Sequence, residues 1–154
     1  MLDDVLDLAK LDAEKMELDD FEVPIRTLCH GIIEALTFKK NYNVALLDNI
    51  EQDVPFVVRG DPKRLRQIIT NLMGNALKFT TSGSVTLRVT NQYQSLELAE
   101  PQQIGIRFEI IDTGIGMPEH VREKLFKPFT QADSSTTRKF GGTGLGLSIS
   151  KKLV

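Results

Sequence analysis

Cysteine, long apolar runs and net charge are all scarce in this sequence, and each absence excludes a class of protein. Cys29 is the single cysteine among 154 residues, so no disulfide can form within the chain and a reducing compartment is favoured. No apolar run approaches the length of a membrane span and no signal peptide precedes the chain, so we expect no membrane contact by this segment. The formal net charge of −2 gives no indication of a nucleic-acid-binding surface.

The size and composition are those of one globular domain with room for a short appendage, since 41% of the residues are hydrophobic and 26% are charged. Residues 2–18 have the pattern of a helix with one apolar stripe, formed by Leu2, Val5, Ala9, Ala13 and Met16. This helix could pack on its own domain or belong to a dimerising helix hairpin, and its pattern leaves both open. Because Met1 leads directly into the helix, we expect a segment of a longer protein.

The remainder of the chain alternates between strand and helix patterns. A short strand over 19–23 precedes a helix over 24–40, with Pro24 in its first turn. Asp61 followed by Pro62 is a helix start signal, an N-cap carboxylate and then proline, and it predicts a helix over 62–79. Further strands are expected over 44–47, 56–58, 85–90 and 104–110, with a polar loop over 91–103 and a last helix from about Leu145.

The predicted helix 62–79 has two distinct faces. Its apolar face is expected to cover a sheet and consists of Leu65, Ile68, Ile69, Leu72, Ala76 and Phe79. Beside it, Asn71, Asn75 and Lys78 are spaced i, i+4 and i+7 and form a polar stripe at the rim of the core. Because an amide oxygen is a hard ligand for magnesium and an ammonium group attracts phosphate, the stripe suits a polar ligand. A solvated helix face is the alternative.

Asp112 lies at the end of an apolar row. Ile106, Phe108 and Ile110 alternate along the predicted strand, and Asp112 continues their parity where glycines begin. Burial of an isolated carboxylate is costly, so a carboxylate in this position needs hydrogen-bond donors, which a ligand could supply. The alternative is that Asp112 caps the Asp-Thr-Gly turn.

Glycines gather in two clusters, 112-DTGIGM-117 and 141-GGTGLGLSIS-150. The second cluster precedes the last predicted helix, whose first turn offers free N–H groups to phosphate. Its spacing is neither the dinucleotide fingerprint nor the P-loop, and a glycine-rich loop alone is a weak signal. Between the clusters, 126-FKPFTQADSSTTRKF-140 has the pattern of a flap that Phe126 and Phe129 anchor at its base.

The ordered set NLMGNALKF, DTGIGM, FKPF and GGTGLGL resembles the ATP-binding catalytic domain of sensor histidine kinases, and FKPFTQAD and TRKFGGTGLGL resemble the hybrid type. The wider superfamily includes DNA gyrase, the mismatch-repair ATPases and a heat-shock chaperone. The resemblance implies a two-layer α/β sandwich of the α+β class, the Bergerat-type fold, with helices 24–40, 62–79 and the last helix on one face of a mixed sheet. It assigns residues 1–18 to the end of the dimerisation and phosphotransfer hairpin and residues 19–154 to the catalytic domain.

The resemblance also implies ligands and roles. The cofactors are ATP and Mg²⁺, with Asn75 as the magnesium ligand and Asp112 as the acceptor of a hydrogen bond from the adenine amino group. Phe126 and Phe129 anchor the lid. The other residues implied to border the nucleotide are Asn71, Lys78, Phe79, Gly114, Gly116, Arg138, Lys139, Gly142, Thr143, Gly144, Leu145 and Gly146.

The type of residue at position 71 differs between branches of the superfamily. Its ATPases have, four residues before the magnesium asparagine, a glutamate that acts as base toward water, and here that position is Asn71. The resemblance therefore implies phosphoryl transfer to a protein histidine, in two-component phosphorelay signalling, rather than chaperone- or topoisomerase-like ATP hydrolysis. A truncated or degenerate nucleotide-binding regulatory module without kinase activity is the alternative.

Two departures from the family pattern affect what this segment can do. The phosphoacceptor motif is absent, and the contexts of His30 and His120 do not fit it, so each is expected to be an ordinary helix residue. The family continues after the last helix into two further strands, which we expect to be missing after Val154. The implied partners are a phosphoacceptor helix and a receiver domain outside the segment, with a homodimeric parent protein. The implied location is cytoplasmic, or the cytoplasmic part of a membrane-bound sensor.

Overall fold

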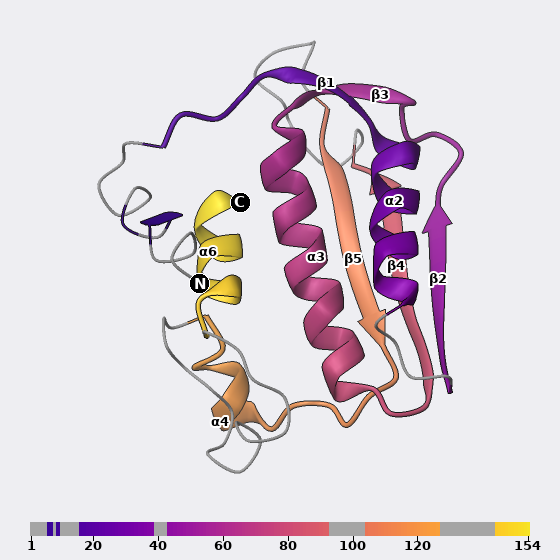
Figure 1. Cartoon of the computed structure of the whole chain (residues 1–154), viewed down its shortest axis with the longest axis vertical. Coiled ribbons are helices and arrows are strands. Elements are labelled where there is room, and N and C mark those ends of the chain that lie inside the picture. The colour runs from indigo at the N-terminus through magenta and orange to yellow at the C-terminus, as the bar shows by residue number, and fades with distance from the viewer. Residues whose placement is uncertain (1–5, 8, 10–15, 39–42, 93–103, 127–143) are drawn as a thin grey trace.

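Helices lie on one face of a small mixed sheet in the computed structural model, which describes residues 6, 7, 9, 16–38, 43–92, 104–126 and 144–154 (Figure 1). The sheet has the strand order β2-β4-β5. Strand β2 (Val44–Ile50) runs parallel to β4 (Gly83–Asn91), with Val44 opposite Gly83 and Ile50 opposite Val89. Strand β5 (Ile106–Asp112) runs antiparallel to β4, and its last residue, Asp112, lies opposite Val85.

A second sheet has two strands, one just before α2 and the other just before α3. Strands β1 (Phe21–Pro24) and β3 (Val57–Gly60) pair antiparallel, with Phe21 opposite Gly60 and Pro24 opposite Val57. The sequence predicts that Pro24 lies in the first turn of the following helix. This strand pairing instead holds Pro24 in β1, just before the helix. Pro24 has the extended conformation (φ −74°, ψ 98°) and acts as the N-cap of α2 (Ile25–Thr37).

The long helix α3 (Pro62–Phe79) has the bounds that its sequence predicts. Asp61 is its N-cap, and its Oδ1 accepts a hydrogen bond from the backbone N–H of Arg64 at 2.9 Å. The short helix α4 (Glu119–Arg122) follows the loop after β5, and α6 (Gly146–Leu153) lies beside α3 (Figure 1). None of the helices in the described part of the chain combines the length and apolar character that a bilayer span requires.

The main core fills the space between α2, α3 and the sheet. On β4, Val85, Leu87 and Val89 are fully buried, whereas Thr86 and Arg88 point to the opposite face and are half-buried. The helices contribute Ile25, Leu28, Cys29, Ile32, Leu36, Ile69, Met73 and Ala76. A separate small cluster consists of Leu145 and Ile149 with Leu153, so α6 has its own apolar contacts beside α3. The predicted α+β sandwich with a mixed sheet is confirmed.

Several predicted boundaries differ from the structure. Helix α2 ends at Thr37 rather than at residue 40, and residues 39–42 lie outside the described residues. Strand β2 continues to Ile50 because its parallel partner β4 supplies hydrogen bonds beyond the apolar run that ends at Leu47. Residues 16–18 are not helical, although the predicted helix 2–18 includes them; of that helix, the structure describes Leu6, Asp7 and Ala9, which are helical.

The core-facing side of α3 is rotated relative to the predicted apolar face. Ile69, Met73 and Ala76 are buried, and Leu65 and Leu77 pack against them from partly buried positions. In contrast, Ile68, Leu72 and Phe79 are half-buried and lie outside this cluster. The sheet and α2 therefore cover one side of α3. The part of the predicted apolar face formed by Ile68, Leu72 and Phe79 lies outside this contact.

Candidate functional site

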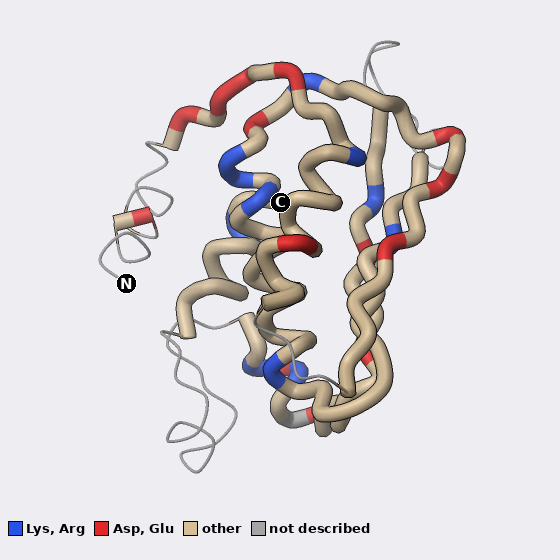
Figure 2. Tube along the Cα trace, turned by 45° about the vertical axis from the view of Figure 1, so that its right-hand side comes forward, with Lys and Arg blue, Asp and Glu red and all other residues tan. Residues whose placement is uncertain are grey.

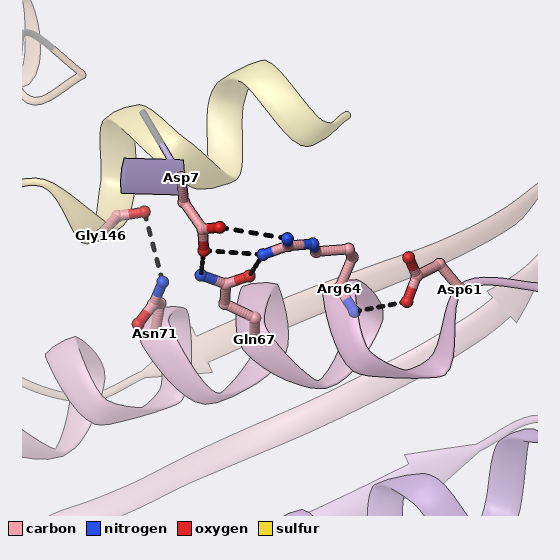
Figure 3. Close-up of polar contacts among 6 residues, drawn as sticks. All are labelled: Asp7, Asp61, Arg64, Gln67, Asn71 and Gly146. Atoms are coloured by element: carbon pink, nitrogen blue, oxygen red, sulfur yellow. Dashed lines mark hydrogen bonds and ion pairs between the residues drawn. The ribbon is translucent and has the colours of Figure 1, made fainter. Parts of the chain in front are cut away.

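Helix α3 connects the two glycine clusters, which are far apart in the sequence. The side-chain amide of Asn71 donates a hydrogen bond to the carbonyl oxygen of Gly146, at a long 3.4 Å, where α6 begins (Figure 3). At the C-terminal end of α3, the carbonyl oxygen of Phe79 accepts a hydrogen bond from the N–H of Ile115 at 3.2 Å, in the loop that follows β5. One helix thus brings the polar stripe next to both glycine-containing segments.

The beginning of α6 has features of an anion-binding helix terminus. Its N-cap residue is Leu145, whose hydrocarbon side chain is 1% exposed and cannot accept hydrogen bonds from the first turn. Gly144, just before it, has φ +69°, a conformation that favours glycine. A Cβ on Gly146 would lie 3.2 Å from Cγ of Asn71, so the glycine permits close packing of α6 against α3. The first N–H groups of α6 are therefore placed near the Asn71 end of the stripe.

Asn75 and Lys78 continue the same face of α3 toward its C-terminus. Both side chains are half-buried. The Lys78 ammonium lies 5.2 Å from the centroid of the Phe79 ring. Asn75 makes no side-chain hydrogen bond to any other described residue, which leaves its amide oxygen available to a ligand.

Asp112 ends β5 and is exposed, so the structure does not bury its carboxylate. Its Oδ1 accepts a hydrogen bond from the N–H of Gly114 at 2.9 Å, which stabilises the Asp-Thr-Gly turn. The turn-capping alternative is therefore realised in this structure. The second carboxylate oxygen, Oδ2, accepts no hydrogen bond from another described residue and can serve a ligand as well.

Gly114 is placed where no side chain would fit. A Cβ at this position would lie 2.5 Å from the carbonyl oxygen of Phe79 and 2.9 Å from Oγ1 of Thr80. The loop after Asp112 therefore passes directly against the C-terminal end of α3, which only glycine permits. Gly116 has φ +69°, and a Cβ added there would meet nothing within 4 Å among the described residues.

Three residues around this loop were not singled out from the sequence: Thr113, Gly83 and Thr80. Oγ1 of Thr113 accepts a hydrogen bond from the N–H of Ser84 at 3.0 Å, and the N–H of Thr113 donates to the carbonyl of Ser84 at 3.1 Å. Gly83 (φ +106°) makes room for Thr113, since a Cβ on Gly83 would lie 2.1 Å from Oγ1. Buried Thr80 donates to the carbonyl of Ala76 at 2.8 Å. Thr80 could have been identified from the sequence, because it lies at the C-cap of α3 directly after the polar stripe.

The predicted flap is described only at its beginning. Phe126 is 43% exposed, and the Lys151 ammonium of α6 lies 5.4 Å from the centroid of its ring. The remaining predicted residues of the lid and of the glycine-rich loop lie outside the described residues; they are Phe129, Arg138, Lys139, Gly142 and Thr143.

A polar cluster joins the N-terminal segment to the beginning of α3. The Arg64 guanidinium contacts both carboxylate oxygens of Asp7, at 2.7 and 3.1 Å, and Gln67 donates to Asp7 Oδ2 at 3.1 Å (Figure 3). Both ionic side chains are only 16% exposed. The hydrogen bonds from Arg64 hold the pKa of Asp7 below its usual value despite the opposing effect of burial. Asp61 also has a lowered pKa, because backbone N–H donors outweigh its desolvation.

The histidines and the cysteine do not form a site in the described part of the chain. His30 lies on the exposed face of α2, with Nε2 3.0 Å from Oδ2 of Asp48. Cys29 is fully buried, and burial together with the nearby Asp48 carboxylate raises its pKa to about 11. His120 lies in α4, but its side chain is not described. Among the described residues, no group of three or more histidine, cysteine or acidic side chains could hold a metal ion.

Comparison with curated proteins gives relatives over the whole chain. It is 43% identical over its full length to the signal transduction histidine-protein kinase BarA of Escherichia coli (strain K12), of which it spans 16%. It is 38% identical over its full length to the hybrid signal transduction histidine kinase A of Dictyostelium discoideum, of which it spans 7%. The chain thus corresponds to a small part of these longer proteins.

Solved structures and a family model agree with these relatives. Full-length ShkA in complex with AMPPNP matches with a TM-score of 0.78 and 31% identity, over 98% of this chain and 29% of that one. The catalytic domain of histidine kinase ThkA matches in fold, with a TM-score of 0.62 and 24% identity over 90% of this chain and 80% of that one. Residues 60–154 match the model of the histidine kinase-, DNA gyrase B- and HSP90-like ATPases, and the chain belongs to this family.

Proposed function

We propose that this chain is the ATP-binding catalytic domain of a hybrid-type histidine kinase, which binds Mg-ATP and transfers the γ-phosphoryl group to a histidine outside the segment. One observation carries the proposal: α3 contacts the Asp112 loop through Phe79 and the beginning of α6 through Asn71. The names of the relatives, which are histidine kinases, and the AMPPNP complex of ShkA support it.

The adenine end of the proposed site is the loop after β5. Asp112 would accept a hydrogen bond from the adenine amino group through Oδ2, while Oδ1 keeps its hydrogen bond to Gly114. The absence of a side chain at Gly114 and the positive φ of Gly116 would let the backbone pass close to the base.

The phosphates would lie along the polar stripe of α3, between it and the beginning of α6. Lys78 supplies a positive charge, Asn71 supplies amide donors, and the first N–H groups of α6 add hydrogen bonds that favour an anion. In this proposal Gly142, Thr143, Gly144 and Gly146 bring further backbone donors, and Arg138 and Lys139 approach the γ-phosphate.

The residues present fit a magnesium ion held mainly by the nucleotide. Asn75 offers one half-buried amide oxygen, and Mg²⁺ in nucleotide sites is commonly bound by one or two protein oxygens together with phosphates and water. A closed protein cage is not needed for such an ion. Bound there, the ion would neutralise charge on the phosphates.

The chemistry that this site favours is phosphoryl transfer rather than hydrolysis. An amide at position 71 cannot remove a proton from water, so the chain supplies no general base there for attack on the γ-phosphate. Its contribution to transfer would be positioning of the triphosphate and neutralisation of its charge, which are the main sources of catalysis in phosphoryl transfer.

The proposed partners are outside this segment. They are a phosphoacceptor histidine helix and a receiver domain of the same or another protein, within a homodimeric kinase. His30 is paired with Asp48 on the exposed face of α2, which does not favour it as the acceptor. We propose a cytoplasmic location for the segment, in a soluble kinase or in the cytoplasmic part of a membrane-bound sensor.

Calorimetric titration with Mg-ATP tests the nucleotide site. In the variant Asp112→Ala, we expect the affinity to fall at least about tenfold, because a hydrogen bond to a charged group contributes about 1.5–3 kcal/mol. Asp53→Ala is the matched control, since Asp53 is an exposed aspartate in the turn between β2 and β3. Unchanged affinity of Asp112→Ala would refute the adenine contact.

Loss of the magnesium dependence in Asn75→Ala is expected from the same titration.

A phosphotransfer assay separates the kinase from a regulatory module that only binds nucleotide. Radiolabelled ATP and a supplied phosphotransfer hairpin are added to the chain, and phosphohistidine is measured. Label on the hairpin histidine supports the kinase. Nucleotide binding without label would favour the regulatory module, and steady release of phosphate into solution would instead favour an ATPase.

A further inference from the structure

The polar stripe of α3 is longer than the proposed nucleotide site. Arg64 and Gln67 precede Asn71 by seven and four residues, so all three side chains lie on one face of the helix. The half of this face near the N-terminus of α3 contacts Asp7, and the other half carries the residues proposed to contact phosphates (Figure 3). The N-terminal segment and the nucleotide therefore use adjacent parts of the same surface.

Asp7 occupies a site that is built for an oxyanion. Arg64 contacts its two carboxylate oxygens at 2.7 and 3.1 Å, and Gln67 donates to one of them at 3.1 Å. The arrangement is itself ordered, because Arg64 also donates to Oε1 of Gln67 at 2.8 Å. A guanidinium fork with an adjacent amide binds carboxylate and phosphate by the same donors.

The site that holds Asp7 lies next to Asn71 along α3, where the phosphates are proposed to bind. Gln67 and Asn71 are neighbours at i and i+4, about one helical turn apart. The Asp7 carboxylate, bound to Gln67, thus places a negative charge about one helical turn from Asn71 and at the same time neutralises Arg64. Both effects disfavour a polyphosphate beside Asn71.

We propose that docking of the N-terminal segment through Asp7 onto Arg64 and Gln67 opposes nucleotide binding at the adjacent Asn71, so that this contact is autoinhibitory. The inference rests on the proposed function, since it concerns regulation of the same site. Binding effects of this kind are reciprocal: nucleotide must weaken docking by the same factor by which docking weakens nucleotide binding.

Two further contacts hold residues 19 and 20, which follow the N-terminal segment in sequence. Both contacts lie far from Asn71, near the beginning of α3. Oδ2 of Asp61 accepts a hydrogen bond from the N–H of Asp19 at 3.1 Å, and Arg59 pairs with Asp20 at 3.0 Å. Figure 2 shows the acidic residues of this segment on the same side of the molecule as the basic residues at the beginning of α3. These contacts can keep residues 19 and 20 in place while Asp7 is released.

The first test is titration of the full chain with Mg-AMPPNP at low and high salt. Asp7→Asn removes the charge and frees Arg64, so we expect the affinity to rise about fivefold or more at low salt, within the usual range of coupling between sites. The increase should shrink in about 1 M salt, where the Debye length is about 3 Å. Asp20→Asn is the matched control, because it breaks an exposed Arg–Asp pair that is remote from Asn71 and should leave the affinity unchanged.

The second test follows docking directly, by the distance between nitroxide labels on Ala9→Cys and Phe38→Cys. Both positions are exposed, and the buried Cys29 will not be labelled. We expect a narrow distribution in the parent chain that broadens with Mg-AMPPNP, and one that is already broad in Asp7→Asn. A narrow distribution in every sample would overturn the inference, as would equal nucleotide affinities of Asp7→Asn and the parent chain. If neither protein binds nucleotide, the proposed function itself fails.

Discussion

The side-chain amide of Asn71 donates a hydrogen bond to the carbonyl of Gly146, and this contact joins two motifs that lie 75 residues apart in the sequence. The same carbonyl accepts a hydrogen bond from Oγ of Ser150 at 2.9 Å, within α6. The packing of α6 against α3 therefore includes this amide hydrogen bond and the close approach that Gly146 allows.

Gly146→Ala tests that close approach. The new Cβ would lie 3.2–3.4 Å from the side-chain atoms of Asn71, so Asn71 must shift by a few tenths of an ångström. We expect weaker binding of Mg-ATP with little loss of stability, because alanine favours a helix over glycine by up to about 1 kcal/mol. Calorimetry and thermal unfolding measure the two effects. Gly60→Ala, where a Cβ meets nothing within 4 Å, is the control and should bind nucleotide normally.

Gly114→Ala should be more severe, because its Cβ would collide with backbone. The carbonyl oxygen of Phe79 would lie at 2.5 Å and cannot move without disturbing the end of α3. We expect a loss of about 1–3 kcal/mol in the free energy of unfolding, as for other overpacking substitutions, together with loss of nucleotide binding. Gly31→Ala is the matched control: its Cβ meets nothing closer than 3.7 Å, so within α2 it should stabilise by about 0.5–1 kcal/mol. Equal stabilities of the two variants would contradict the prediction.

The Asp7–Arg64 pair predicts a dependence of stability on pH. The pKa of Asp7 is lower in the folded protein than in the unfolded chain, so its stabilising contribution is present above the unfolded value and is lost as the pH falls through the folded one. The difference in unfolding free energy between the parent chain and Asp7→Asn should therefore be constant between about pH 7 and 5 and decline below about pH 4. Urea unfolding at several pH values measures it. A difference that does not change down to about pH 2 would count against the pair.

Cys29 should be unreactive in the folded protein. Its side chain is fully buried, and a pKa of about 11 leaves almost no thiolate near neutral pH. We expect no alkylation by iodoacetamide in buffer and complete alkylation in denaturant, measured by mass spectrometry. Rapid modification without denaturant would show that α2 opens away from the sheet.

Much of the fold follows from local pattern. The bounds of α3 were predictable because Asp61 and Pro62 define its beginning and the Thr-Thr-Ser-Gly turn ends its pattern. The alternation of Val85, Leu87 and Val89 likewise predicts β4 and its buried face. In contrast, β2 extends to Ile50 over Asp48 and Asn49, which are poor strand residues, because its pairing with β4 stabilises an extended backbone there.

The sequence alone determined the family, the polar stripe of α3 and the two glycine clusters beside it, since these depend on residue type and spacing along the chain. Only the tertiary structure decided which side of α3 faces the core and that Asp7 binds Arg64 and Gln67. These features depend on segments far apart in sequence, such as Asp7 and Arg64 at a separation of 57 residues, and no local pattern specifies which of them meet.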